Sequence, residues 1–297
     1  MRHLQIYRFI AEVARRGSIR KTADHLHITP SALTRKIQDF EEELGTPIFE
    51  RMPQGMRLNA AGELLLRHIH DQGAGFERLR TQLSDLAGLR RGHVTVACAQ
   101  AFIDSVLPEE IAAYRAQFPH VSFAVEVRDN YLGIGALVNY DADLALLIDP
   151  PPSAEMLELL VKKQPVCAVV GKSHPLARLD TVRLRDCFRH PVAMPGQALA
   201  IRTHLDEAIY RHRLDARIAV ESGSLEFLRN FVLREDAVTF LPFSGVPRAD
   251  ERLRAVPVSA QDLDPLKVVL GQLKGRTLSI AAEKFAEQLS AHLPDLS

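Results

Sequence analysis

Hydrophobic positions in the first 44 residues recur every three or four residues, the spacing of one buried helical face. Residues that end or start helices separate three such segments: Gly17 and Ser18 first, then Thr29 and Pro30. The apolar positions are Leu4, Tyr7, Ile10, Ala11, Ala14, Ile19, Ala23, Leu26, Leu33, Ile37, Phe40 and Leu44. The pattern predicts three short helices, the last two forming a helix-turn-helix.

Polar residues are left on the outer face of the third predicted helix, namely Ser31, Thr34, Arg35, Lys36 and Gln38. Hydrogen-bonding groups near the N-terminus of such a helix are what reads base edges in the major groove. The same spacing is equally typical of the solvated face of an ordinary helix. Two extended runs, 48–51 and 57–59, then flank a turn-rich tip at 52–56. They predict a two-stranded wing, with Arg51 and Arg57 placed to contact phosphate.

The segment from Met1 to about Leu66 resembles the winged helix-turn-helix of LysR-type bacterial transcriptional regulators. The landmarks that carry the resemblance are Phe9, Gly17-Ser18, Ala23, Leu26, Ser31-Ala32-Leu33-Thr34-Arg35, Ile37, Leu44-Gly45-Thr46-Pro47-Ile48-Phe49-Glu50-Arg51 and Leu58-Asn59-Ala60-Ala61-Gly62. Relatives usually have Gln then Pro where this chain has Pro30 then Ser31, and that Gln often reads a base. The resemblance implies a domain at 1–62 that binds double-stranded operator or promoter DNA through Ser18, Thr29, Pro30, Ser31, Thr34, Arg35, Lys36, Gln38, Arg51 and Arg57.

A heptad pattern follows, with seam positions Leu65, Ile69, Gln72, Phe76, Leu79, Leu83 and Leu86. So narrow a stripe is typical of a helix that packs against a copy of itself, although the core helix of a monomer is an alternative. With the family resemblance, it predicts a dimerising linker helix over 63–89. The chain is therefore expected to form a homodimer or homotetramer, with RNA polymerase as a candidate additional partner.

After a hinge at 88–92, predicted strands and helices alternate. Strands are expected at 93–98, 121–127, 143–148, 166–170, 217–220 and 238–241, and helices at 106–117, 132–140, 201–212 and 225–233. This rhythm predicts an α/β fold with parallel sheets and right-handed crossovers. Residues 90–297 resemble the effector-binding region of the same family, a two-subdomain, periplasmic-binding-protein-like (Rossmann-like) fold. The matching fragments are Leu107-Pro108, Asp143-Leu144-Ala145, His174-Pro175-Leu176-Ala177, Leu241-Pro242 and Leu278-Ser279. Subdomain I is expected at about 90–162 and 266–297, and subdomain II at about 163–265.

In a fold of this kind a small-molecule effector sits where helix N-termini face a cleft, because they offer free N–H groups and partial positive charge. The expected contacts are Gln100, Ala101, Phe102, Gly196, Gln197, Ser222 and Ser224, with Phe243 as a further apolar wall. These groups favour an anionic or hydroxylated effector. Alternatively, Ser222 or Ser224 only caps its helix.

Composition changes this picture little. The chain has 37 basic and 37 acidic side chains, and ten basic against seven acidic fall within residues 1–62. Apolar stretches are too short to span a bilayer, and charge interrupts the N-terminus too early for a secretory signal, so we expect a cytoplasmic protein without a membrane partner. Cys98, Cys167 and Cys187 form no C-x-x-C pair, which argues against a disulfide scaffold or a zinc site.

No catalytic or cofactor motif stands out, so we expect no catalytic residues, no metal and no cofactor. Gly133-Ile134-Gly135 lacks the third glycine of a dinucleotide loop, and the pairs His25/His27 and His68/His70 point apart on helices. The favoured interpretation is a DNA-binding regulator controlled by an effector. Two alternatives remain at this point: a cytoplasmic small-molecule-binding protein, or a metabolic enzyme on the same solute-binding fold.

Overall fold

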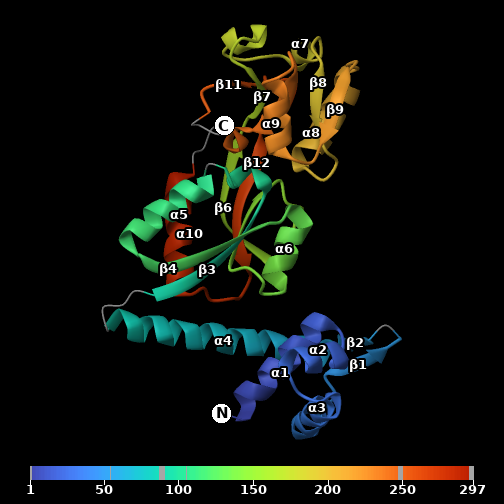
Figure 1. The fold of residues 1–297 in the computed structure, drawn as a ribbon, viewed down its shortest axis with the longest axis vertical. Coiled ribbons are helices and arrows are strands. Elements are labelled where there is room, and N and C mark those ends of the chain that lie inside the picture. Colours follow the sequence, from blue (N-terminus) through green and yellow to red (C-terminus); the bar gives the residue numbers. More distant parts are fainter. Residues whose placement is uncertain (1, 54, 87–90, 105, 247–249, 294–297) are drawn as a thin grey trace. The chain divides into compact units, whose positions relative to one another are not determined.

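The computed structural model describes residues 2–53, 55–86, 91–104, 106–246 and 250–293, which form two compact units, 1–80 and 81–297. Each unit is described by itself. The first unit contains the helices α1 (Arg2–Arg16), α2 (Ile19–Leu26) and α3 (Pro30–Leu44), the strands β1 (Phe49–Met52) and β2 (Gly55–Leu58), and most of the helix α4 (Ala60–Leu86) (Figure 1).

The three N-terminal helices form because the chain supplies a cap at each turn. Ser18 accepts the N–H of Lys21 at the start of α2, and Thr29 accepts the N–H of Ala32 at the start of α3. Their apolar faces meet in one core with Ile48 and Phe49 of the wing. The strands β1 and β2 pair antiparallel, which completes the predicted winged helix-turn-helix.

The second unit is built on two five-stranded sheets. In the first sheet the strand order is β4 (His120–Val127), β3 (Arg91–Cys98), β5 (Leu144–Ile148), β12 (Leu266–Leu273) and β6 (Met156–Gln164). In the second sheet it is β11 (Leu253–Pro257), β7 (Val166–Gly171), β10 (Val238–Pro242), β8 (Val192–Pro195) and β9 (Ile218–Ser222). The chain thus leaves the first sheet after β6 and returns to it with β12.

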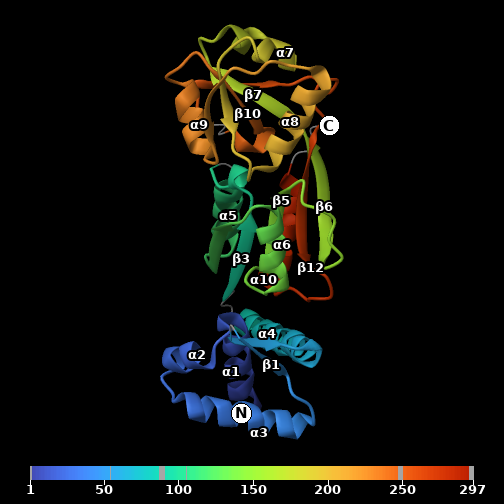
Figure 2. The same ribbon diagram turned by 90° about the vertical axis from the view of Figure 1, so that its right-hand side faces the viewer.

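Helices cover these sheets. The helices α5 (Val106–Gln117) and α10 (Ile280–His292) lie on one face of the first sheet, and α6 (Asn130–Val138) lies on the other (Figures 1 and 2). The helices α8 (Ala200–His212) and α9 (Leu225–Val232) pack on the second sheet, which also carries the short helix α7 (Leu184–Cys187). Three 3-10 turns, η1 (Gln100–Phe102), η2 (Pro175–Arg178) and η3 (Phe243–Gly245), complete the described elements.

The prediction of parallel sheets is confirmed for part of each sheet and wrong for the rest. The strand β12 runs antiparallel to β5 and β6, and β7 runs antiparallel to β10 and β11. Parallel neighbours need a crossover connection, usually a helix, and this holds for β3 with β4 and β5 and for β8 with β9 and β10. The antiparallel neighbours are far apart in the chain, because β12 returns to β5 and β6, and β10 and β11 return to β7. Both subdomains are therefore mixed α/β structures.

Candidate DNA-contact surface and effector pocket

The outer face of α3 presents polar side chains to solvent. Ser31, Arg35, Lys36 and Gln38 are exposed, as is Pro30 at the start of the helix. The Thr34 hydroxyl is half-buried and donates to the carbonyl of Pro30 at 2.9 Å, so its oxygen remains available only as an acceptor. This face offers the donors and acceptors that base edges require.

The wing is fixed by its backbone to the turn between α1 and α2. The N–H of Met56 donates to the carbonyl of Gly17 at 2.8 Å, and a Cβ on Gly55 would lie 2.2 Å from that same oxygen. Gly55 also has a φ of 136°, so only glycine fits there. On the wing, Arg57 is exposed and lies opposite Glu50, whereas the Arg51 side chain lies outside the described residues.

The remaining predicted DNA contacts, Ser18 and Thr29, are capping residues. The Ser18 hydroxyl accepts the Lys21 N–H at 3.4 Å, and the Thr29 hydroxyl accepts the Ala32 N–H at 3.2 Å while lying 3.2 Å from the Ser31 hydroxyl. Their first role is therefore to start α2 and α3. Thr29 is nevertheless exposed, so its second lone pair faces solvent beside Ser31.

The seam of α4 is divided between two environments. Ile69 is buried and Leu65 is half-buried in the core of the first unit, so these two side chains already have partners in their own chain. Gln72 is exposed, and Phe76 and Leu79 keep 56% and 49% of their surface exposed. The helix continues to Leu86, but the side chains of Leu83 and Leu86 lie outside the described residues. Among the seam side chains that the structure describes, Gln72, Phe76 and Leu79 are thus the ones exposed for contact with another chain.

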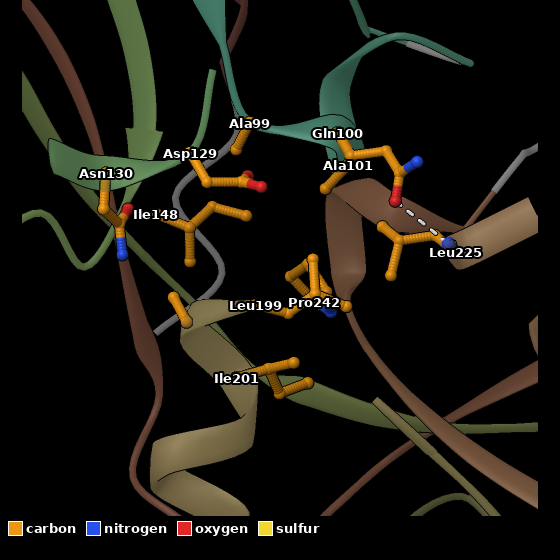
Figure 3. Close-up of a pocket in the computed structure, with 11 residues that line it drawn as sticks. Ala99, Gln100, Ala101, Asp129, Asn130, Ile148, Leu199, Ile201, Leu225 and Pro242 are labelled. Atoms are coloured by element: carbon orange, nitrogen blue, oxygen red, sulfur yellow. Dashed lines mark hydrogen bonds between the residues drawn. The ribbon is translucent and has the colours of Figure 1, made fainter. Parts of the chain in front are cut away.

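A pocket in the second unit lies between the two sheets and encloses about 340 Å³ of space, part of it open to solvent. One wall comes from the first sheet and its loops, and the other from α8, α9 and β10 (Figure 3). The lining residues are Ala99, Gln100, Ala101, Asp129, Asn130, Ile148, Leu199, Ala200, Ile201, Leu225 and Pro242. Gln100 spans the two walls, because its Oε1 accepts the N–H of Leu225 at 2.9 Å.

Only two of the predicted effector contacts, Gln100 and Ala101, line this pocket. Phe102 is fully buried in the core, and Gln197 is exposed elsewhere. Gly196 packs closely against the backbone of Gly223, since a Cβ at position 196 would lie 2.9 Å from the Gly223 nitrogen. Phe243 is half-buried against the core and does not line the pocket.

The hydroxyls of Ser222 and Ser224 also have local partners instead of lining the pocket. Ser222 Oγ accepts the N–H of Ser224 at 3.1 Å, and Ser224 Oγ accepts the N–H of Phe227 at 3.2 Å. The capping alternative therefore describes their observed contacts.

Two polar lining residues, Asp129 and Asn130, were missed from the sequence. They follow β4 after Arg128, and the carboxyl ends of parallel strands are where such folds place ligand contacts. Their place at a strand end is therefore the sequence signal that points to them. The Asp129 side chain is directed into the pocket (Figure 3). Burial raises the pKa of Asp129, which the backbone N–H of Gln100 partly offsets by donating to the carboxylate.

Buried arginines near the pocket are already neutralised. Arg202 donates to Asp206 and to the carbonyl of Pro195 and lies 2.9 Å from Glu221. Arg229 pairs with Asp104 and donates to the carbonyl of Gly245 at 3.0 Å. Neither guanidinium lines the pocket.

The three cysteines are buried, and burial raises the pKa of each thiol to about 12. Because the thiolate is the reactive form, these residues behave as small apolar side chains.

We therefore expect the native chain to react with a disulfide reagent such as DTNB far more slowly than the urea-unfolded chain, in which all three thiols should react. Absorbance of the released thiolate measures both rates. Rapid stoichiometric labelling of the native chain would contradict the assignment.

One further cluster joins His174, His190 and Asp236 in the second unit. Nδ1 of the buried His174 accepts the N–H of Leu176 at 3.1 Å, so in the neutral ring Nε2 carries the proton and points toward Asp236 Oδ1 at 3.5 Å. A protonated Nε2 has no lone pair for a metal ion, and burial lowers the pKa of His174. This geometry favours a neutral, structural histidine.

Within the described part of the chain, no helix is both long and apolar enough to cross a membrane.

Comparisons with known proteins identify the family to which both parts of the chain belong. Residues 4–63 match the model of the bacterial regulatory helix-turn-helix protein, lysR family, and residues 87–294 match the LysR substrate binding domain. The transcriptional dual regulator GltC of Bacillus subtilis is 27% identical, with 96% of this chain and 95% of that protein covered.

Solved structures share the fold. A full-length OxyR variant of Pseudomonas aeruginosa has a TM-score of 0.69 at 20% identity, covering 96% of this chain and 94% of that chain. Full-length CbnR complexed with its target DNA has a TM-score of 0.58 at 16% identity, covering 97% and 99%. The curated relatives are named as regulators of transcription rather than enzymes. The chain belongs to the LysR family and is a DNA-binding transcriptional regulator with an effector-binding domain.

Proposed function

We propose that this regulator binds its operator as a homodimer or as a homotetramer made of two such dimers, and that a small molecule in the pocket between the two sheets changes its affinity for DNA. The observation that carries the effector site is the pocket itself, which draws its lining from both halves of the second unit. The partners beyond DNA are therefore a second copy of the chain and the effector. If the regulator activates transcription, RNA polymerase is a further partner. Because operator DNA lies in the bacterial cytoplasm, we place its action there.

Polar links join the two halves of the second unit around this pocket. Gln100 bonds to Leu225, Arg229 pairs with Asp104, and His204 Nε2 lies 3.1 Å from Asp149 Oδ2. Each link joins a segment next to the first sheet to a helix of the second sheet. A ligand that fills the pocket alters the spacing of its walls and so favours one arrangement of these links over another, which is how a bound effector shifts a conformational equilibrium.

On the DNA side, the exposed face of α3 supports direct base contact. We place Arg35, Lys36, Gln38, Ser31 and Thr34 in the major groove, with Thr29 and Pro30 at the helix start. An arginine that donates two hydrogen bonds to guanine is the most common specific contact between a side chain and a base. We assign phosphate contacts to Arg51 and Arg57 on the wing and to Ser18 at the start of α2. In winged folds, the wing and a helix N-terminus contact the DNA backbone.

Arg35→Ala should therefore weaken binding to the DNA upstream of the protein's own gene by about 1–3 kcal/mol, while unrelated DNA is bound as before. Arg57→Ala should instead weaken both DNAs alike and flatten the salt dependence by about one counterion. Fluorescence anisotropy across a salt series measures both effects, with circular dichroism as the check on folding. Equal loss on both DNAs in the Arg35 variant would contradict the base-reading role of α3.

A further inference from the structure

The charge of the effector pocket is negative. Asp129 directs its carboxylate into the cavity, and among the described residues that line it there is no lysine, arginine or histidine (Figure 3). The nearby cations are committed elsewhere: Arg202 to Asp206 and Glu221, Arg229 to Asp104. An anion entering this pocket would meet the negative charge of Asp129 and no positively charged side chain among the described lining residues, which disfavours it.

One of the helix N-termini that the sequence offered for an anion, that of α9, is already satisfied. The first N–H groups of α9 and its preceding turn have protein acceptors: Leu225 donates to Gln100, Phe227 to Ser224, and Ser224 to Ser222. A helix N-terminus attracts an anion through unpaired N–H groups, and here at least three of these donors are engaged within the chain.

Most of the remaining lining is apolar. Ala99, Ala101, Ile148, Leu199, Ala200, Ile201, Leu225 and Pro242 contribute aliphatic surface. Such walls bind a compact hydrocarbon body, and the few polar groups between them fix its orientation.

We infer that this pocket selects a small organic amine, with its ammonium group paired to the Asp129 carboxylate and its hydrocarbon part against the aliphatic walls. This inference rests on the proposed role of the pocket as the effector site, and it replaces the anionic effector that the sequence favoured. Asn130, the next residue along the chain, also lines the pocket, and its amide can form hydrogen bonds with polar groups of the ligand.

An oxygen on the same molecule has a place on the opposite wall. Ala200 and Ile201 line the pocket at the start of α8, and no side chain in the described structure caps that helix. A hydroxyl or carbonyl oxygen can accept there. A carboxylate without an amine gains this contact but leaves Asp129 unpaired.

Titration of Asp129 gives the inference a pH signature. Burial raises the pKa of this carboxyl, and an ammonium ligand binds the ionised form only. Affinity for an amine should therefore be full above the Asp129 pKa and fall as the pH drops through it. The groups identified next to Asp129 are Gln100, which donates its backbone N–H to the carboxylate, and Cys98, whose thiol is neutral. The His204–Asp149 pair lies near the pocket, and its hydrogen bond to Asp149 raises the pKa of His204.

Three probes with the same ring separate the ligand classes: cyclohexylmethylamine, cyclohexylmethanol and cyclohexanecarboxylate. Isothermal titration of the full-length protein at neutral pH should give the amine an affinity at least about tenfold above that of the carboxylate. Asp129→Asn keeps the acceptor for the Gln100 N–H but loses the charge, and should remove this preference. Asp180→Asn, an exposed carboxyl outside the pocket, should leave it unchanged.

The outcomes are distinct. Tighter binding of the carboxylate, no amine binding up to roughly 10 mM, or an amine affinity unchanged in Asp129→Asn overturns the inference. Ala200→Met, which fills the pocket, tests the underlying assignment, because it should weaken all three probes. If the amine binds Ala200→Met as well as the unaltered protein, its site lies elsewhere and the pocket is not the effector site. Operator binding, measured in parallel, reports on the DNA-contact assignment separately.

Discussion

Asp143→Ala should lower the free energy of unfolding of the second unit by about 3–5 kcal/mol, the usual cost of removing one partner of a buried ion pair. Asp143 pairs with Arg276, and both side chains keep less than a fifth of their surface, 18% and 12%. Asp143 Oδ2 also accepts the N–H of Thr95 at 2.8 Å, and Arg276 donates to the carbonyl of Ala142 at 2.8 Å. The aspartate thus connects β3, the start of β5 and the segment before α10.

Without this carboxylate, the Arg276 charge stays largely buried and the Thr95 N–H loses its acceptor. Urea unfolding followed by circular dichroism measures the loss, and hydrogen exchange assigns it to residues 81–297. Asp143→Asn, which can still accept from Thr95, should lose less. Asp141→Ala, an exposed carboxyl two residues earlier, is the matched control. A loss below about 1 kcal/mol in Asp143→Ala would mean that the pair behaves like an exposed one.

The N-terminal domain could be predicted almost residue by residue, because its signals are local. Thr29, Pro30 and Gly45 start and end α3 through their own side chains and backbone angles, and the structure places the helix at Pro30–Leu44. Elements in the first half of the second unit could also be predicted, and α5 was predicted at its observed bounds, Val106–Gln117.

The sheet arrangement of the second unit could not be predicted in the same way. The strands β6, β8, β11 and β12 were not predicted individually, although β12 occupies an inner position of the first sheet. It is buried by β5 and β6, residues more than 90 positions away along the chain. Hydrophobic periodicity reports which side chains are buried, but it does not report which strand lies alongside or in which direction.

In the effector pocket, too, some residues could be predicted from the sequence and others could not. Gln100 was found because it follows a recognisable strand, and its amide does contact α9. Ser222 and Ser224 were predicted to face a ligand because hydroxyls at a helix start suit an oxygen-rich molecule, but the same residue types are the best helix caps. Only the three-dimensional contacts distinguish the two roles. Asp129 was missed because a single acidic residue after a strand carries no pattern.

The dimer is where the second large effect is expected: Phe76→Glu combined with Leu79→Glu should convert the protein to monomers. Both side chains are about half exposed on α4, unlike Leu65 and Ile69, which the first unit already covers. Complete burial of such a side chain is worth about 1.5–3 kcal/mol, and about half of each surface remains to be buried, so the four side chains of a two-fold interface should contribute roughly 3–6 kcal/mol. That corresponds to a dissociation constant raised by about two to four orders of magnitude.

Light scattering at micromolar concentration measures the change, and circular dichroism confirms that the helices persist. Asp71→Lys, a charge change at an exposed position of the same helix outside the seam, should remain dimeric. Because a dimer holds two recognition helices at a fixed spacing, the monomeric variant should also lose most of its affinity for an inverted-repeat operator while keeping its weak affinity for a half-site. A double variant that is still dimeric would assign self-association to another surface, and α4 would then serve only to connect the two units.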